Sequence, residues 1–245
     1  MKSSNLTLLV AGTVFLAALT IYNFSLKAEY LRADFKDPFY GYSKLAFKNF
    51  DKIDIKAGNL LGVKIIKGDK FDVRVDDDIK DDLSIIQNGG TLSIAVKDTT
   101  QRAYYYLQGL TIFCPTLREL RVDAQKTVFH DRENRRVIEY QKQDDQRILM
   151  EMFSLDSLTI VQGINNTVKL NRNRIGMLKA LTGREGMWGS KLIIEGDNVI
   201  KSADISIFNG NHLALKVAQI EDLNLNPSDS SSVELHGRAL KLLKN

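Results

Sequence analysis

Apolar and polar residues alternate in short runs from Phe50 onward, and a period of two is the spacing of a β-strand. Clear runs lie at 71–75, 92–96 and 213–217, and segments rich in Gly, Asn and Asp separate them. Helical spacing over ten or more residues is hard to place in this part of the chain. The pattern predicts an all-β domain over residues 50–245.

A second pattern, apolar-x-x-apolar-x-apolar, recurs within the same region. Copies begin at Phe50, Leu117, Leu155, Ile175 and Ile220. The copies at Leu155 and Ile220 are each followed by a polar turn and a further apolar run, 168–170 and 233–235 respectively. Strand, turn and strand at a recurring length predict a chain that stacks on itself, here as a single right-handed β-helix-like solenoid.

Two other β architectures compete with this interpretation. Residues 220–225 begin like a leucine-rich repeat, which recurs every ~20–29 residues with an Asn or Cys at a fixed place. The copies here start 67, 38, 20 and 45 residues apart, and the fixed Asn is missing. An irregular β-helix fits the spacing better, and a two-sheet sandwich remains open.

The segment Leu6–Phe24 contains 19 residues and no charge. As a helix it would rise about 28 Å, close to the hydrocarbon thickness of a bilayer. It is longer than the apolar part of a typical signal peptide, and no clean small-x-small cleavage site follows it. The sequence therefore predicts one transmembrane helix that is retained, with residues 6–24 in contact with the membrane.

This segment divides the chain into an anchor (1–24), a juxtamembrane segment (25–49) and the β domain (50–245). Lys27, Arg32 and Lys36 follow the anchor, so charge alone does not fix the topology. A β domain behind a single N-terminal apolar segment is usually exported. We therefore expect a single-pass protein of the bacterial cell membrane, with the β domain on the periplasmic or extracellular side.

The residues from Phe50 to Lys97 resemble a known family. The matching segments are Phe50–Ile55, Val63–Asp69, Phe71–Val75 and Gly90–Ile94. They are similar to the opening of the head-GIN, auto-transporter adhesin-type domains of Bacteroidota, and the later repeats are similar to that family's stacked turns. The resemblance implies a β-helical, exported, non-enzymatic domain, and it supplies no catalytic residue.

The charge of the chain argues against a nucleic-acid partner. Lys and Arg number 34 against 30 Asp and Glu, a formal net charge of +4. The stretch from Arg118 to Arg147 contains eight basic and seven acidic residues, so its charges nearly cancel and predict no one-sided basic patch. We expect no nucleic-acid partner.

The sequence gives weak support for a metal site or a catalytic nucleophile. The carboxylates of 76–82 could bind Ca²⁺, but both the EF-hand spacing and the Gly-Gly-x-Gly-x-Asp repeat are absent, which favours a solvated turn. The three histidines, His130, His212 and His236, lie far apart, although stacked turns could bring them together. Cys114 stands in apolar surroundings and is expected in the core. We predict no metal site and no cofactor.

Aromatic residues are the best candidates for ligand contact. Trp188 lies between glycines in a polar segment and is expected at the surface, and a Tyr run (Tyr104, Tyr105, Tyr106) could stack on sugar rings. No nucleophile elbow, Walker loop or dinucleotide-binding glycine motif is present. The sequence favours a binding or structural role with a protein or glycan partner. The alternatives are a polysaccharide-active β-helix enzyme and an accessory or sensory protein with a fixed membrane partner.

Overall fold

The chain forms two compact units, residues 1–41 and 42–245. A computed structural model describes residues 3–32, 36–97, 107–130, 136–140, 147–216, 219–237 and 239–240. Each unit is described by itself below.

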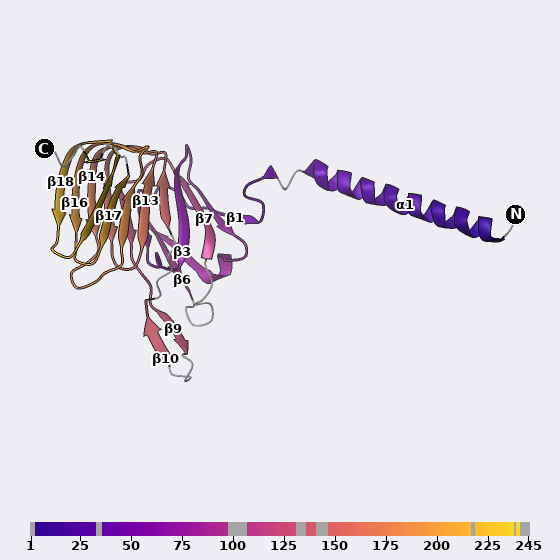
Figure 1. Ribbon diagram of the computed structural model, residues 1–245, viewed down its shortest axis with the longest axis horizontal. Helices are drawn as coiled ribbons and strands as arrows, with labels where there is room; N and C mark the ends of the chain where they lie inside the picture. Colours follow the sequence, from indigo (N-terminus) through magenta and orange to yellow (C-terminus); the bar gives the residue numbers. More distant parts are fainter. Residues whose placement is uncertain are drawn as a thin grey trace. The chain divides into compact units, whose positions relative to one another are not determined.

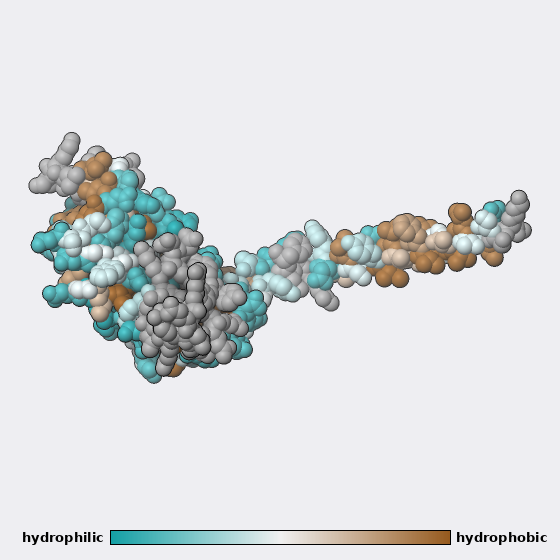
Figure 2. Space-filling view, turned by 60° about the horizontal axis from the view of Figure 1, so that its bottom comes forward, coloured by the Kyte–Doolittle hydropathy of each residue, from teal (hydrophilic) through white to brown (hydrophobic). Residues whose placement is uncertain are grey.

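The first unit contains helix α1, Ser3–Arg32. Apolar side chains gather along its middle in the view of Figure 2, and no residue of its most apolar stretch is buried. A helix that is apolar on all sides suits either a protein core or a bilayer, and α1 lies in no core. The helix continues beyond Phe24 to Arg32, so the first part of the predicted juxtamembrane segment is helical and exposed.

The second unit is built from two large sheets, which we call sheet A and sheet B (Figure 1). In spatial order, sheet A contains β1 (Tyr42–Leu45), β4 (Asp72–Asp76), β7 (Leu107–Cys114), β3 (Leu61–Lys67), β11 (Ile148–Glu151), β13 (Thr167–Asn171), β15 (Lys191–Ile194), β17 (His212–Lys216) and β19 (Ser232–His236). Sheet B contains β18 (Gln219–Pro227), β16 (Val199–Ile207), β14 (Arg174–Thr182), β12 (Ser154–Gln162), β8 (Glu119–Val122), β2 (Lys52–Ile55), β6 (Thr91–Val96) and β5 (Leu83–Asn88). A hairpin of β9 (Thr127–His130) and β10 (Arg136–Glu139) extends away from both sheets, and a 3-10 turn, η2, covers Lys80–Asp82.

From β12 to β19 the chain alternates between the two sheets. Each strand pairs in parallel with the strand two places later, as β12 does with β14 and β13 with β15. Parallel neighbours need a crossover connection, and here the crossover is a strand of the other sheet. The apolar side of every strand is thereby turned toward the opposite sheet.

The repeated apolar pattern is the inner face of sheet B. Its copies pair in register and form three apolar columns: Leu155–Ile175–Ile200–Ile220, Leu158–Leu178–Ala203–Leu223 and Ile160–Ala180–Ile205–Leu225. The copy at Ile200 was missed in the sequence because its central position is the small residue Ala203. With it included, these four strands repeat at intervals of 20, 25 and 20 residues.

The start of the domain departs from this uniform arrangement. The pairs β1–β4, β4–β7 and β5–β6 are antiparallel, so both large sheets are mixed. Strand β1 also begins at Tyr42, before the predicted domain start at Phe50. The prediction of a mostly β chain with one N-terminal apolar helix is confirmed, whereas a single uniform solenoid over 50–245 is not established.

Buried side-chain amides connect successive turns at the points where the chain passes from a strand of sheet A to a strand of sheet B. Asn198 Oδ1 accepts hydrogen bonds from the backbone N and from Nδ2 of Asn173, each at 3.0 Å. Asn198 Nδ2 donates to the carbonyls of Leu170 and Glu195, both at 2.8 Å. Asn173 and Asn198 are fully buried, so these bonds satisfy backbone groups that water cannot reach.

The substitution Asn198→Ala should therefore lower the free energy of unfolding by about 3 kcal/mol, because it leaves several buried polar groups without partners. Asn224→Ala is the matched control, since that side chain lies on the exposed face of β18 and, among the described residues, bonds only to Asp204. Urea unfolding of the full chain in mild detergent gives both values. Equal losses for the two variants would contradict the role assigned to the buried amides.

Candidate functional site

Trp188 lies in the turn between β14 and β15 and is 73% exposed. It borders an open hollow of about 250 Å³, which we call the Trp188 hollow. The other lining residues are Tyr140, Ile164, Asn165, Gly186 and Met187. A large aromatic side chain in water beside an apolar hollow is typical of a contact surface.

The turn that carries Trp188 is fixed by hydrogen bonds on both sides of it. The side chain of Asn211 accepts from Ser190 N at 2.9 Å and donates to Met187 O at 3.0 Å. Gly189 N donates to Gly210 O at 3.2 Å. The indole is therefore presented by a backbone that is already ordered.

A second aromatic ring borders the hollow. The carbonyl oxygen of Tyr140 accepts from Asn165 Nδ2 at 3.3 Å, and Lys126 Nζ lies 5.4 Å from the centre of the Tyr140 ring. The other predicted contact residues, Tyr104, Tyr105 and Tyr106, lie outside the described residues. The role of Trp188 and of the Tyr run in ligand contact remains a prediction.

Trp188 is the only tryptophan in the chain, so its fluorescence reports on this turn alone. Gly210→Ala places a Cβ 2.6 Å from Trp188 Cβ and should change the emission and anisotropy of the indole. Gly89→Ala is the control, since Gly89 shares a positive φ but has open space around it. Both variants should lose about 1 kcal/mol through backbone strain, but only Gly210→Ala should alter the spectrum. An unchanged spectrum would contradict the close packing of the turn.

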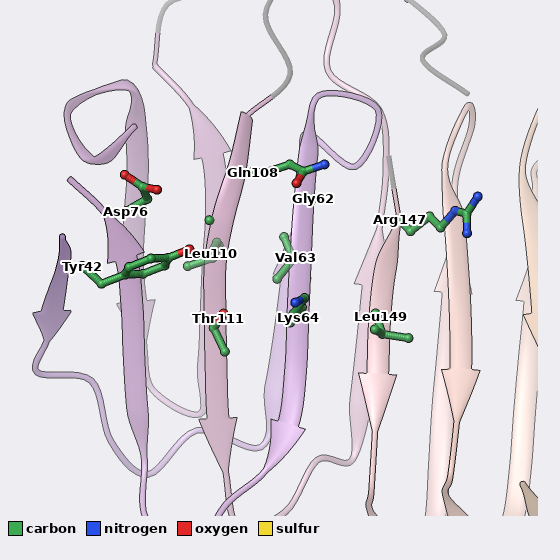
Figure 3. A pocket seen from close by; sticks show the side chains of 11 residues that line it. Tyr42, Gly62, Val63, Lys64, Asp76, Gln108, Leu110, Thr111, Arg147 and Leu149 are labelled. Atoms are coloured by element: carbon green, nitrogen blue, oxygen red, sulfur yellow. The ribbon is translucent and has the colours of Figure 1, made fainter. Parts of the chain in front are cut away.

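A larger hollow of about 440 Å³ opens on the outer face of sheet A (Figure 3). We call it the sheet A hollow. Its lining residues come from β1, β4, β7, β3 and β11 and the residue before β11: Tyr42, Gly62, Val63, Lys64, Asp76, Gln108, Gly109, Leu110, Thr111, Arg147 and Leu149. Sequence reasoning missed this site. The signal that could have revealed it is Gly109, a glycine inside a strand pattern.

The sheet A hollow contains groups of both charges. Figure 3 places Tyr42 and Asp76 on one side, Arg147 on the other and Lys64 between them. Burial, with a further contribution from the charge of Asp76, raises the pKa of Tyr42. In the described part of the chain, neither Lys64 nor Arg147 forms an ion pair.

The acidic turn next to this hollow bonds mostly to neighbouring protein groups. Asp77 accepts from Ser43 Oγ, and Lys80 Nζ donates to the same hydroxyl at 3.0 Å. Asp76 Oδ1 accepts from Asp78 N at 2.9 Å. Among the described residues, no group of three or more His, Cys, Asp or Glu could hold a metal ion.

Two of the three histidines meet at the C-terminal end of sheet A. His212 Nε2 lies 3.1 Å from Glu234 Oε2, and His236 Nε2 bonds to the other oxygen of the same carboxylate. Burial and the nearby Lys191 lower the pKa of His212. The pairing of β17 with β19 brings these residues together, as stacking of turns allows. The side chain of His130 lies outside the described part.

Cys114 is a core residue, as its apolar sequence context predicted. It is completely buried, and burial raises the pKa of its thiol to about 12. A thiol in this state is protonated at neutral pH and is not a nucleophile.

Comparisons with known proteins identify structural neighbours of low sequence identity. No protein-family model and no curated protein matches the chain. The crystal structure of a "putative adhesin" from Bacteroides fragilis aligns with a TM-score of 0.42 and 14% identity, covering 79% of this chain and 95% of that one. A "putative adhesin" from Parabacteroides distasonis aligns with a TM-score of 0.43 and 14% identity, covering 80% and 81%. A "putative lipid binding protein" from the same species aligns at 0.28 and 14%, covering 78% and 95%. Two of these three neighbours are named as adhesins of Bacteroidales, the kind of protein whose domains the sequence resembles.

Proposed function

We propose that this chain is a membrane-anchored protein of the cell envelope whose β domain binds a protein or glycan partner and catalyses no reaction. The observation that carries the proposal is the exposed Trp188, held by an ordered turn beside an apolar hollow. Natural binding surfaces use rigid aromatic anchors of this kind, because little conformational entropy is lost when a partner covers them.

The proposal includes a finer description of the fold. The alternation of strands from β12 to β19 and their parallel pairing support a two-sheet solenoid, right-handed by the general rule for parallel crossovers. The domain division proposed from the sequence is an anchor (1–24), a juxtamembrane segment (25–49) and a solenoid of the adhesin type (50–245). Because β1 already pairs within sheet A, we extend the β domain to begin at Tyr42. A rigid stack of this kind suits the presentation of a surface better than it suits a closing active site.

α1 supports the membrane part of the proposal. Its apolar stretch is long enough to cross a bilayer, and its side chains are exposed. The full chain should therefore stay in the membrane pellet after alkaline carbonate extraction, whereas a chain carrying Leu16→Lys together with Ala17→Lys should be released.

External protease should digest the β domain of intact or outer-membrane-permeabilised cells. A soluble protein whose mature N-terminus lies beyond residue 24 would refute the anchor.

The binding role is tested at Trp188. Neutral oligosaccharides such as chitotriose and cellotriose, titrated into the full chain in detergent, should shift the indole emission toward shorter wavelength as a sugar ring covers it. Calorimetry with Trp188→Ala should give an affinity at least about tenfold weaker, as for a typical aromatic anchor. Met177→Ala, an exposed apolar residue on the outer face of sheet B, serves as the control.

The same experiment addresses the enzymatic alternative. If the chain is a binder, each oligosaccharide should be recovered intact after long incubation. Shortened products that disappear when a single carboxylate is replaced would overturn the non-enzymatic proposal. If no oligosaccharide changes the Trp188 emission, glycan binding at this residue is contradicted and the proposed partner is a protein. Cross-linking from position 188 in cell envelopes would then test that partner.

A further inference from the structure

We propose that the sheet A hollow is a separate binding site for a monosaccharide-sized polyol that carries one carboxylate, such as a uronic acid residue of an acidic glycan. Its volume of about 440 Å³ lies within the usual range for small-ligand sites, about 300–1,000 Å³. The site lies on the strand face of sheet A and does not share a lining residue with the Trp188 hollow. It therefore stands independently of the function proposed for Trp188.

Two strand glycines line the floor of the hollow. Gly62 and Gly109 lie on the neighbouring strands β3 and β7, and the register between these strands shifts at Gly62, which leaves Gly109 as the extra residue of a bulge. Gly109 has φ of +115°, and a Cβ there would lie 2.5 Å from Asp76 Cβ, so this glycine makes room for the Asp76 side chain at the edge of the floor. Gly62 lines the hollow without a side chain of its own. Glycine weakens a strand, and strand glycines and bulges often mark a place where a ligand approaches the backbone.

The cationic side of the hollow is unusual for this face of the sheet. Neighbouring cations are paired: Lys44 and Arg74 with Asp72 at 3.4 and 3.0 Å, and Lys169 with Glu195 at 2.8 Å. Within the described residues, Lys64 and Arg147 have no such acid partner. Both are exposed at the hollow and could bind an anion, and a guanidinium is well suited to a carboxylate.

The opposite side of the hollow carries groups that suit hydroxyls and a ring. The carboxylate of Asp76 accepts hydrogen bonds, and the exposed amide of Gln108 both donates and accepts. The ring of Tyr42 extends over β4 toward β7 (Figure 3) and offers an aromatic surface to the C–H face of a sugar. These groups recognise a polyol rather than a simple anion.

The charges select a monoanion. Lys64 and Arg147 contribute two positive charges and Asp76 one negative charge, so the hollow carries one excess positive charge. A carboxylate balances it, whereas a doubly charged phosphate would leave an excess negative charge in the hollow beside Asp76. A neutral sugar would leave both cations without a partner.

The test is calorimetric titration of the full chain, in a sugar-free polyoxyethylene detergent, with glucuronic acid, galacturonic acid and their short oligomers. Saturable binding should occur with these acids and be at least about tenfold weaker with glucose and galactose, because one charge-assisted contact is lost. Lys64→Gln combined with Arg147→Gln should weaken uronate binding at least as much. Lys179→Gln, on the exposed face of β14, should leave it unchanged.

Two further variants keep the outcome clear. Gly62→Val adds methyl groups to the floor without changing any charge, and it should abolish uronate binding while circular dichroism and cooperative melting remain those of the folded chain. Trp188→Ala should leave uronate binding intact, which separates this site from the function proposed above. Equal binding of neutral and acidic sugars, no saturable binding at millimolar uronate, or no effect of the Lys64 and Arg147 changes would overturn the proposal. Tighter binding of phosphoethanolamine than of uronate would also overturn it and would indicate a lipid headgroup.

Discussion

The burial of in-register apolar columns between two sheets is the interaction on which the rest of this domain depends. Each strand has one apolar side, which it cannot hide alone, and the opposite sheet covers it. The columns headed by Leu155 and Leu158 are continuous only because every turn returns the chain with the same side facing inward. A slip of one residue would expose a whole strand's apolar set, so the turns and their buried amides are held to strict geometry.

The two candidate sites arise from this frame in different ways. Trp188 lies in a turn outside the paired strands. A large side chain can extend into water there without disturbing the packing of the core. The sheet A hollow lies within the ladders themselves, where Gly62 and Gly109 remove side chains from the outer face. One site is a projecting aromatic surface and the other a recess with opposed charges, so they suit different ligands.

Local spacing predicted much of the fold and little of the site. The period of two identified most strands, because inward and outward residues differ strongly in polarity. The copy at Ile200 escaped notice because Ala203 gives a weak apolar signal, although it pairs in register with Leu178. The pairing of β3 with β11 joins Val63 to Ile148, and no local pattern encodes a contact over that distance. The meeting of His212 and His236 at Glu234 depends on a different pairing, that of β17 with β19.

The hairpin β9–β10 shows what such a frame tolerates. The chain leaves the two sheets after β8, forms the hairpin, and returns to them at β11. Even so, β8 pairs with β12 and β11 pairs with β13 in unbroken register. Length can therefore be gained or lost at the rim while the inner columns remain as they were. Relatives of such a domain are therefore better recognised by the spacing of their inward residues than by total length.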